Sequence, residues 1–292
     1  MLNKYQEELM RLLNSEQKTI AMLAPSFVID FPHPQIVGML EKLGFDKVVE
    51  LTFGARMVNY WYREYILAHP EQKIFIASPC PAIVAFIEKM YPSLIQYLIP
   101  YASPMYAMAK ICKKEHPDHA IVFISPCQAK RILEAPKYPD FVDAVITFKE
   151  LDEIFKEKKI RPEDFTDSEY PFSSFITERT KIYPMSGGLA KTSHVRNFFR
   201  PDEICVTDGA ENNRKILDDL QNGTSPYRFI DILNCPGGCI GGPDIVNRNL
   251  SHEEKDKLIL EYRNKSIIDK EDGQEGRKEF VLDIDFGTKF KT

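Results

Sequence analysis

The sequence lacks a long hydrophobic run, an excess of positive charge and a biased tract. Its 292 residues carry 38 Lys and Arg against 43 Asp and Glu, a net charge of −5. No stretch reaches the ~18 apolar residues of a membrane helix, and residues 1–18 alternate charged and apolar positions where a secretory signal would be continuously apolar. An acidic balance gives no general attraction to nucleic acid or anionic lipid. We therefore expect a cytoplasmic protein that binds neither nucleic acid nor membranes.

Cysteine is also scarce, and its scarcity limits the structural roles that it can have. Six cysteines in a chain of this length are too few for a fold built on disulfides. In a reducing compartment, clustered cysteines indicate metal ligands or redox groups. Their positions relative to strands and helices therefore indicate which of them could bind a metal.

Short runs rich in β-branched residues alternate with stretches of helical periodicity. The expected strands are Thr19–Met22, Val48–Leu51, Lys73–Ile76, Ala120–Ile124, Val142–Thr147, Ile204–Thr207 and Phe229–Leu233. The expected helices are Pro34–Leu43, Met57–Leu67, Pro81–Met90, Pro104–Lys114 and Ala210–Leu220. This alternation is typical of an α/β fold with mainly parallel sheets flanked by helices.

Two of these strands end in the same three residues. Residues 75–81 (FIASPCP) and 123–127 (FISPC) each run from an apolar strand through Ser-Pro-Cys toward a helix, which indicates two similar lobes that face each other. Ligands bind beyond the carboxyl ends of such strands, and the start of a helix lowers the pKa of a cysteine and favours thiolate. Cys80 and Cys127 are therefore candidate metal ligands. The alternative is two small buried cysteines at turns.

The most specific motif follows the last expected strand. Residues 233–243 (LNCPGGCIGGP) hold Cys235 and Cys239 around two glycines, and glycine allows a tight turn with both sulfurs on one side. A structural zinc site usually has its second cysteine pair nearby in the sequence, whereas the other two candidates are single and far apart. This pattern favours an iron–sulfur cluster, but thiolates alone bind either metal.

With these three motifs in this order, the sequence resembles the catalytic (H-cluster) domain of iron-only, or FeFe, hydrogenases over roughly residues 19–246. Residues 78–81 (SPCP) are similar to the family's TSCCP, residues 126–130 (PCQAK) to its MPCxxK, and residues 235–242 match its CPGGCIGG. The resemblance implies a single domain of two intertwined lobes, approximately 18–145 and 146–250, with the cluster in the cleft between them. The charged residues 264–292 are expected to form a tail with a short strand.

The resemblance also implies the cofactor, an H-cluster made of a 4Fe–4S cluster and a di-iron subcluster that carries CO and CN⁻. Cys239 would bridge the two parts. The ligands of the 4Fe–4S cluster would be Cys80, Cys127, Cys235 and Cys239.

Other segments resemble the surroundings of the family's cluster. Lys130 matches the lysine that meets one cyanide, and the turn after the first expected strand resembles the Ala-Pro turn against the other. A second Ser-Pro and a turn similar to the family's T-G-G complete the set. The implied contacts are therefore Lys130, Ala24, Pro25, Ser26, Ser103, Pro104, Ser186 and Gly187.

Several positions depart from the family's proton relay. Pro79 stands where the family has a proton-donating cysteine, Leu133 replaces a glutamate, with Glu134 next to it, and Ile99 replaces a serine. Of the relay acids, Glu64 is the one that the resemblance retains. Efficient turnover along that relay is therefore not expected. A different proton path through Tyr60, Tyr62 and Glu64 is an alternative.

Cys80 is the first cysteine, so the resemblance implies a minimal form without a ferredoxin-like module. Electrons would come from an external carrier such as ferredoxin, and hydrogenase maturation proteins would supply the di-iron subcluster. Three functions stay open: reversible reduction of protons to H₂, redox or hydrogen sensing without turnover, and iron–sulfur assembly with a 4Fe–4S cluster alone. The lost relay favours the second, and the lack of N-terminal cysteines counts against the third.

Overall fold

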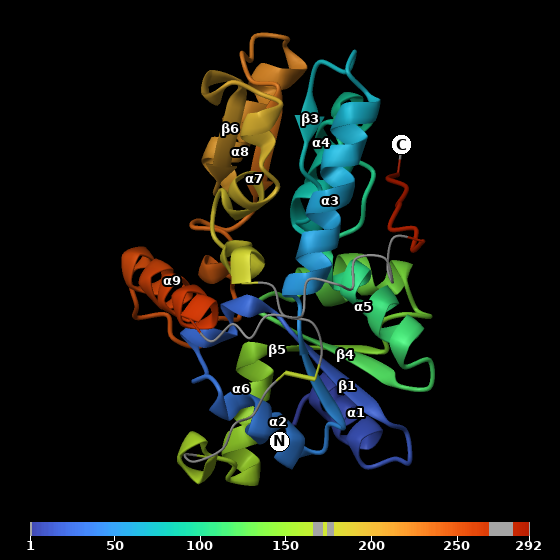
Figure 1. The fold of residues 1–292 in the computed structure, drawn as a ribbon, viewed down its shortest axis with the longest axis vertical. Helices are drawn as coiled ribbons and strands as arrows, with labels where there is room; N and C mark the ends of the chain where they lie inside the picture. Colours follow the sequence, from blue (N-terminus) through green and yellow to red (C-terminus); the bar gives the residue numbers. More distant parts are fainter. Residues whose placement is uncertain (1, 166–171, 174–177, 269–282, 292) are drawn as a thin grey trace.

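The architecture is two parallel sheets, one above the other, joined by a long helix. A computed structural model describes residues 2–165, 172–173, 178–268 and 283–291. Helix α3 (Thr52–Ala68) runs from the lower lobe into the upper one, and α9 (His252–Ile268) lies to one side (Figure 1). Among the described helices, none is both long enough and apolar enough to cross a membrane.

The first sheet has the order β2-β1-β4-β5, with all neighbours parallel. Every residue of β1 and β4 is buried, as expected for parallel strands that helices cover on both faces. The strands are β1 (Thr19–Leu23), β2 (Lys47–Glu50), β4 (Ala120–Ser125) and β5 (Ala144–Thr147). The helices packed around it are α1 (Lys4–Leu13), α2 (Gln35–Leu43), α5 (Pro104–Glu115) and α6 (Phe148–Lys158).

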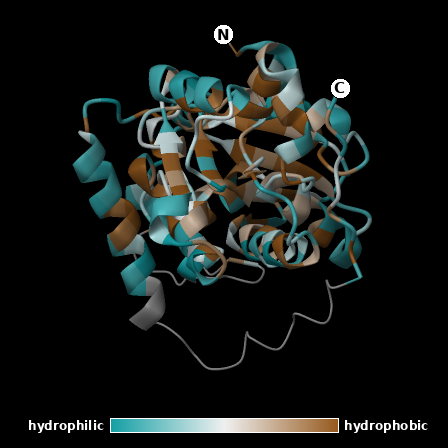
Figure 2. Cartoon of the chain, turned by 90° about the horizontal axis from the view of Figure 1, so that it is seen from above, coloured by the Kyte–Doolittle hydropathy of each residue, from teal (hydrophilic) through white to brown (hydrophobic). Residues whose placement is uncertain are grey.

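The second sheet is smaller and has the order β3-β7-β6, again parallel. Its strands are β3 (Phe75–Ile76), β6 (Ile204–Asp208) and β7 (Phe229–Leu233). The helices of this lobe are α4 (Pro81–Met90), α7 (Gly188–Thr192) and α8 (Ala210–Gln221). Hydrophobic residues gather in the strands and hydrophilic residues on the outward sides of the helices (Figure 2).

The α/β class and the parallel sheets predicted from the sequence are confirmed. Helix α3 begins five residues before the expected Met57, because its first turns are buried against α5 and show no polar face. The packing is so close that a Cβ on Gly54 would meet the Pro104 carbonyl oxygen at 2.7 Å. Strand β3 is shorter than expected, with two residues. The expected lobe boundary near residue 145 stays a prediction. The two halves of the chain share one sheet, because β3 from the N-terminal half pairs with β7.

The tail expected from residue 264 begins differently in the structure. Residues 264–268 are helical, because they form the end of α9, which continues to Ile268. The predicted strand near residues 280–284 lies mostly outside the described residues. Beyond it, Gly287 forms an isolated antiparallel bridge with Tyr101.

Candidate metal centre

Two of the candidate cysteines reach the same sheet edge because their strands are neighbours. Strands β3 and β7 pair in parallel with Ile76 opposite Ile230, so the chain leaves both strands at the same edge. Cys80 follows β3 as the N-cap of α4, and Cys235 follows β7. This is the edge at which α/β sheets bind ligands.

The third cysteine comes from the other sheet. Cys127 lies just beyond β4, where its backbone N–H donates to the Ser125 hydroxyl at 3.2 Å. Its sulfur accepts a hydrogen bond from the Ala129 N–H at 3.3 Å. The chain then enters a short π-helix, η3 (Lys130–Glu134), where the sequence predicted an ordinary helix.

The glycine turn with Cys235 and Cys239 is held by the segment before α7. Gly237 and Gly238 have φ values of +74° and +89°, which only glycine adopts cheaply. The Cys239 N–H donates to the Pro184 carbonyl at 2.7 Å, and the Ser186 N–H donates to the Gly237 carbonyl at 3.1 Å. The predicted Ser186–Gly187 turn therefore lies directly against the cysteine turn.

Contacts just beyond the glycine turn bring it to Cys127. The Asp244 N–H donates to the Pro126 carbonyl at 3.0 Å, and the Asp244 carboxylate accepts the Gln128 N–H at 3.2 Å. Gly242 packs so closely on this loop that a Cβ there would meet the Pro126 carbonyl oxygen at 2.6 Å. The second and third motifs, more than a hundred residues apart, therefore form one surface.

The four thiols lie close enough to act on one another. Burial raises the pKa of Cys239 well above its ordinary value, and the charges of Cys80, Cys127 and Cys235 raise it further. Burial followed by the charges of Cys127 and Cys80 raises the pKa of Cys235 to about 11. The four cysteines predicted from the motifs therefore converge on one place.

The expectation of a lowered cysteine pKa at the start of a helix is wrong for Cys127. Burial raises the pKa of this thiol, and the Ala129 hydrogen bond and the Lys130 charge oppose the rise without reversing it. Desolvation of the charged form outweighs the few exposed N–H groups of a short helix. Burial raises the pKa of Cys235 and Cys239 as well, so these three thiols hold their protons until a metal displaces them.

Lys130 lies between the motifs. Its ammonium group donates to the Pro79 carbonyl at 3.0 Å and pairs with the Glu134 carboxylate at 2.6 Å. The other Glu134 oxygen accepts the backbone N–H of Ser103, the N-cap of α5, at 3.3 Å. The structure therefore brings the predicted residues Lys130, Ser103 and Pro104 to one network, and adds Glu134.

The turn after β1 is fully enclosed. Ala24, Pro25 and Ser26 are buried, and a short 3₁₀ helix, η1 (Pro25–Ile29), begins there. The Ala24 N–H donates to the Ile124 carbonyl at 3.1 Å, which ties the turn to the strand that leads to Cys127. The Ser26 hydroxyl is buried without a hydrogen-bond partner among the described residues. An enclosed hydroxyl in this state fits a polar ligand better than an apolar core.

Glu64 differs in exposure from the other predicted site residues. It is exposed on α3, where its charge acts on Tyr101. Tyr62, in contrast, is fully buried, and its hydroxyl shares a 2.8 Å hydrogen bond with Ser78, two residues before Cys80. Ile99 is also completely buried. The proposed path through Tyr60, Tyr62 and Glu64 stays a prediction.

The remaining cysteines belong to the core: Cys112 is buried in α5 and Cys205 in β6. In the described part of the chain, no group of three or more His, Cys, Asp or Glu side chains is placed to hold a metal ion. A four-iron cluster takes its thiolates at separate iron corners, so its ligands stand further apart than those of one zinc ion. The preference for a cluster over a single zinc ion therefore comes from the spacing of the four cysteines in the sequence.

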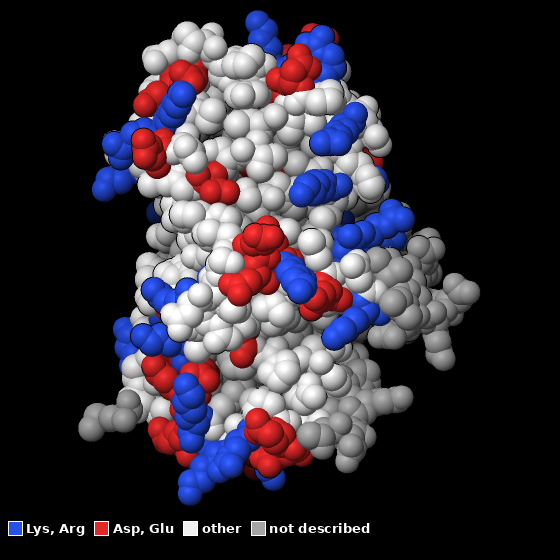
Figure 3. All heavy atoms as spheres, turned by 90° about the vertical axis from the view of Figure 1, so that its left-hand side faces the viewer, with Lys and Arg blue, Asp and Glu red and all other residues white. Residues whose placement is uncertain are grey.

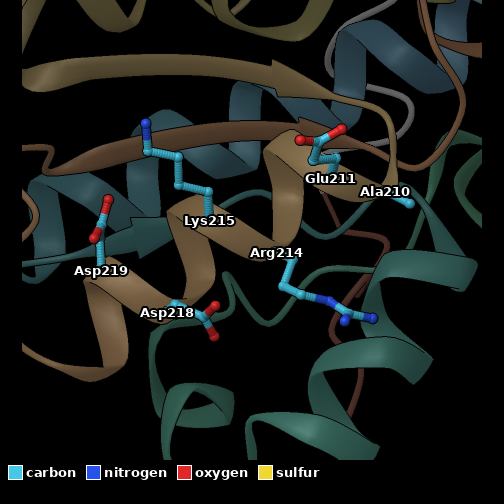
Figure 4. A pocket seen from close by; sticks show the side chains of 6 residues that line it. All are labelled: Ala210, Glu211, Arg214, Lys215, Asp218 and Asp219. Carbon is cyan, nitrogen blue, oxygen red and sulfur yellow. The ribbon is translucent and has the colours of Figure 1, made fainter.

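Two features of the described surface carry side chains of both charges. A shallow hollow along α8 is lined by alternating charges, the residues Ala210, Glu211, Arg214, Lys215, Asp218 and Asp219 (Figure 4). On the face shown in Figure 3, acidic and basic side chains are mixed. Neither feature shows a field of one sign.

Sequence reasoning missed Glu134 and Asp244 as site residues. The signal for Glu134 was its spacing of four from Lys130, at which side chains on a helix meet. Asp244 carries no such signal, because its role depends on a long-range contact with the loop of Cys127.

Comparisons with known proteins agree with this geometry. A sequence model described as the C-terminal domain of the iron-only hydrogenase large subunit matches residues 17–243. Iron hydrogenase 1 of Clostridium pasteurianum is 25% identical over 71% of this chain, which spans 44% of that protein. The cytosolic Fe-S cluster assembly factor narfl of Danio rerio is 24% identical over 77% of this chain and 68% of its own length.

Solved structures show the same fold. FeFe-hydrogenase HydA1 from Chlamydomonas reinhardtii superimposes with a TM-score of 0.67, at 19% identity, over 88% of both chains. The paired parallel sheets and their connections are thus those of a known architecture. At this identity the likeness concerns the fold alone.

Proposed function

Given that this chain belongs to the family of iron-only hydrogenases, in the C-terminal domain of their large subunit, we propose that it binds a 4Fe–4S cluster between its two sheets. The observation that carries this proposal is that strand pairing and loop contacts bring together four cysteines from three separate motifs. The ligands would be Cys80, Cys127, Cys235 and Cys239. The match to the hydrogenase family and the likeness to narfl identify the chain as an iron–sulfur protein of that family.

The donor set supports this proposal. Four thiolates are the usual ligands of a 4Fe–4S cluster, and the Ala129 N–H already donates to the Cys127 sulfur. Hydrogen bonds of this kind to cluster sulfurs tune reduction potentials. Because burial raises the pKa of Cys127, Cys235 and Cys239, cluster binding should release protons and weaken as the pH falls.

We further propose that Cys239 carries a di-iron subcluster, which when bound supplies the chemistry 2H⁺ + 2e⁻ ⇌ H₂. The residues of this chain that would surround it are Lys130, the buried Ser26 hydroxyl and the Ser186–Gly187 turn. Ser26 would donate to a polar ligand, and the enclosed turn at Ala24 and Pro25 would exclude water. Electrons would come from an external carrier such as ferredoxin, and maturation proteins would load the subcluster.

A specific observation favours a second candidate, a redox or hydrogen sensor without turnover. The positions equivalent to the family's proton relay hold Pro79, Ile99 and Leu133, none of which has a side-chain proton to transfer. Ile99 is fully buried, so water does not reach it from outside. The narfl relative keeps a third candidate open, iron–sulfur assembly with the 4Fe–4S cluster alone.

One experiment separates these functions. The chain is produced together with hydrogenase maturation enzymes under anaerobic conditions, and iron content, infrared spectrum and H₂ release with a strong reductant are measured. CO and CN⁻ bands with H₂ release support the enzyme, and bands without H₂ release support the sensor. Iron without such bands leaves the 4Fe–4S protein.

The same preparation tests the ligands. Cys235→Ala removes one thiolate and is expected to abolish cluster absorbance and most bound iron. Cys205→Ala removes a core thiol of β6 and is the matched control, with iron close to the unmodified chain. Unchanged iron and absorbance in Cys235→Ala would reject the ligand assignment.

A further inference from the structure

The Lys130 side chain connects two loops that carry single cysteines. Lys130 begins the π-helix after Cys127, and its ammonium group donates to the carbonyl of Pro79, the residue before Cys80. The lysine side chain is only 15% exposed, so the hydrogen bond is largely shielded from water. In a low dielectric such a charge-assisted bond is strong.

Glu134 extends this connection to a third segment. One carboxylate oxygen pairs with Lys130 at 2.6 Å, and the other accepts the Ser103 N–H at 3.3 Å. The Glu134 side chain is 9% exposed. The ion pair therefore touches the loop of Cys80, the helix after Cys127 and the start of α5.

The position of this pair completes the framework of the site. Pairing of β3 with β7 fixes Cys80 relative to Cys235, and Asp244 fixes the loop of Cys127 relative to the glycine turn. The side chain of Lys130 provides a direct link between the loops of Cys80 and Cys127. These two loops leave different sheets, so no strand pairing holds them together.

We propose that the Lys130–Glu134 pair is a clamp that positions Cys80 and Cys127 for the 4Fe–4S cluster and sets the charge beside it. The inference rests on the proposed cluster. It gives Lys130 a role in the 4Fe–4S site itself, distinct from the cyanide contact that the family resemblance implies. Both members of the clamp are positioning residues, since they act through the two cysteine loops.

The charges of the clamp predict effects of opposite sign. The Lys130 ammonium favours negative charge on nearby sulfur, and it acts on Cys127 and Cys239. Removing it should make the cluster harder to reduce. Removing the Glu134 charge while Lys130 remains should make it easier to reduce.

The test uses the full chain reconstituted with iron and sulfide, without maturation enzymes, so that it contains no di-iron subcluster. The variants are Glu134→Gln, which is nearly isosteric, and Lys130→Met. Iron release to a ferrous chelator is timed, and the reduction potential is followed by electron paramagnetic resonance. Both variants should release iron about 10-fold faster, the lower range for lost outer-shell contacts.

The potentials distinguish a clamp from a general loss of stability. Glu134→Gln should shift the potential upward and Lys130→Met downward, and the double variant should return toward the unmodified chain. Lys130→Arg keeps the charge and the ion pair, so it should restore the potential; it also serves if Lys130→Met folds poorly. Asp152→Asn, which breaks an exposed i,i+4 pair with Lys156 on α6, is the matched control and should change neither measurement.

Two outcomes overturn the inference in different ways. If the unmodified chain holds its cluster and both clamp variants release iron at the same rate and potential, the clamp is rejected and the proposed function stands. If the unmodified chain takes up no cluster, the proposed function is rejected and the clamp with it.

Discussion

Asp231 is a buried carboxylate in β7 whose charge is only partly compensated. It is 1% exposed, and one oxygen accepts the Ala190 N–H at 2.8 Å. The other oxygen has no hydrogen-bond partner among the described residues. Burial raises its pKa to about 6, and the Ala190 hydrogen bond and the Lys191 charge oppose the rise. The folded protein therefore holds this proton more tightly than the unfolded chain does.

This pKa gives a stability prediction with a definite sign. Since the folded pKa lies above the unfolded value near 3.8, the contribution to stability is greatest below pH 4 and is lost as the pH rises to about 6. Asp231→Asn should remove this loss of stability with rising pH. At pH 8 the variant should be more stable than the unmodified chain by on the order of 3 kcal/mol, because the folded and unfolded pKa values of Asp231 differ by ~2. Urea unfolding of the metal-free protein between pH 4 and 8 measures it.

Asp140→Asn, at an exposed position, is the control and should follow the unmodified chain at every pH. Parallel stability curves for Asp231→Asn and the unmodified chain would show that Asp231 titrates as an ordinary carboxylate.

At the scale of elements, the glycine turn depends on one position more than on the others. Gly238 has φ of +89°, and a Cβ there would meet the Pro184 carbonyl oxygen at 2.5 Å and the Ser186 nitrogen at 2.8 Å. Pro184 accepts the hydrogen bond of the Cys239 N–H. A methyl group on Gly238 therefore pushes apart the two segments that hold this cysteine.

Gly238→Ala is expected to reduce bound iron at least 10-fold after reconstitution. Gly223→Ala is the matched control: its φ is +71°, but no atom lies within 4 Å of a Cβ there. It should cost only the 1–2 kcal/mol of a left-handed residue and keep its iron. Equal iron in the two variants would show that the close approach to Pro184 is not needed for cluster binding.

Elements with local signals could be predicted from the sequence. Strand β7 and helix α4 have the expected bounds, because an apolar run and a proline at the first helical turn are visible without tertiary contacts. The four cysteines were recognised because their motifs are local. Asp244 was missed because its partner comes from a distant segment. The pairing of Glu134 with Lys130 has a local signal, but its contact with Ser103 does not. The pKa of Cys127 was misjudged because burial has no local signal.

At the scale of the whole molecule, a buried ion pair joins three distant segments. Lys181 and Glu50 are 1% and 0% exposed and lie 3.1 Å apart. The Tyr262 hydroxyl of α9 donates to Glu50 at 2.7 Å, and its ring lies 3.5 Å from the Lys181 ammonium. This cluster attaches α9 and the segment before α7 to the end of β2.

Lys181→Met should destabilise the protein by about 3–5 kcal/mol, because it leaves a buried carboxylate without its cation. Urea unfolding at pH 7 measures the change. The double variant Glu50→Gln/Lys181→Met removes both charges and should recover most of the loss. A loss below ~1 kcal/mol in Lys181→Met would mean that Tyr262 and Thr52, which also donates to Glu50, suffice to satisfy the carboxylate.

The strand order has a consequence for how the protein folds during its synthesis. All strands of the first sheet lie within residues 19–147, whereas β3 must wait for β7, more than 150 residues later. During synthesis, when the N-terminal part folds first, the first sheet can form on a nascent chain while Phe75 and Ile76 still lack their partner. The candidate site is therefore assembled last, and a ribosome-bound chain exposes Cys80 and Cys127 before Cys235 and Cys239 have been synthesised.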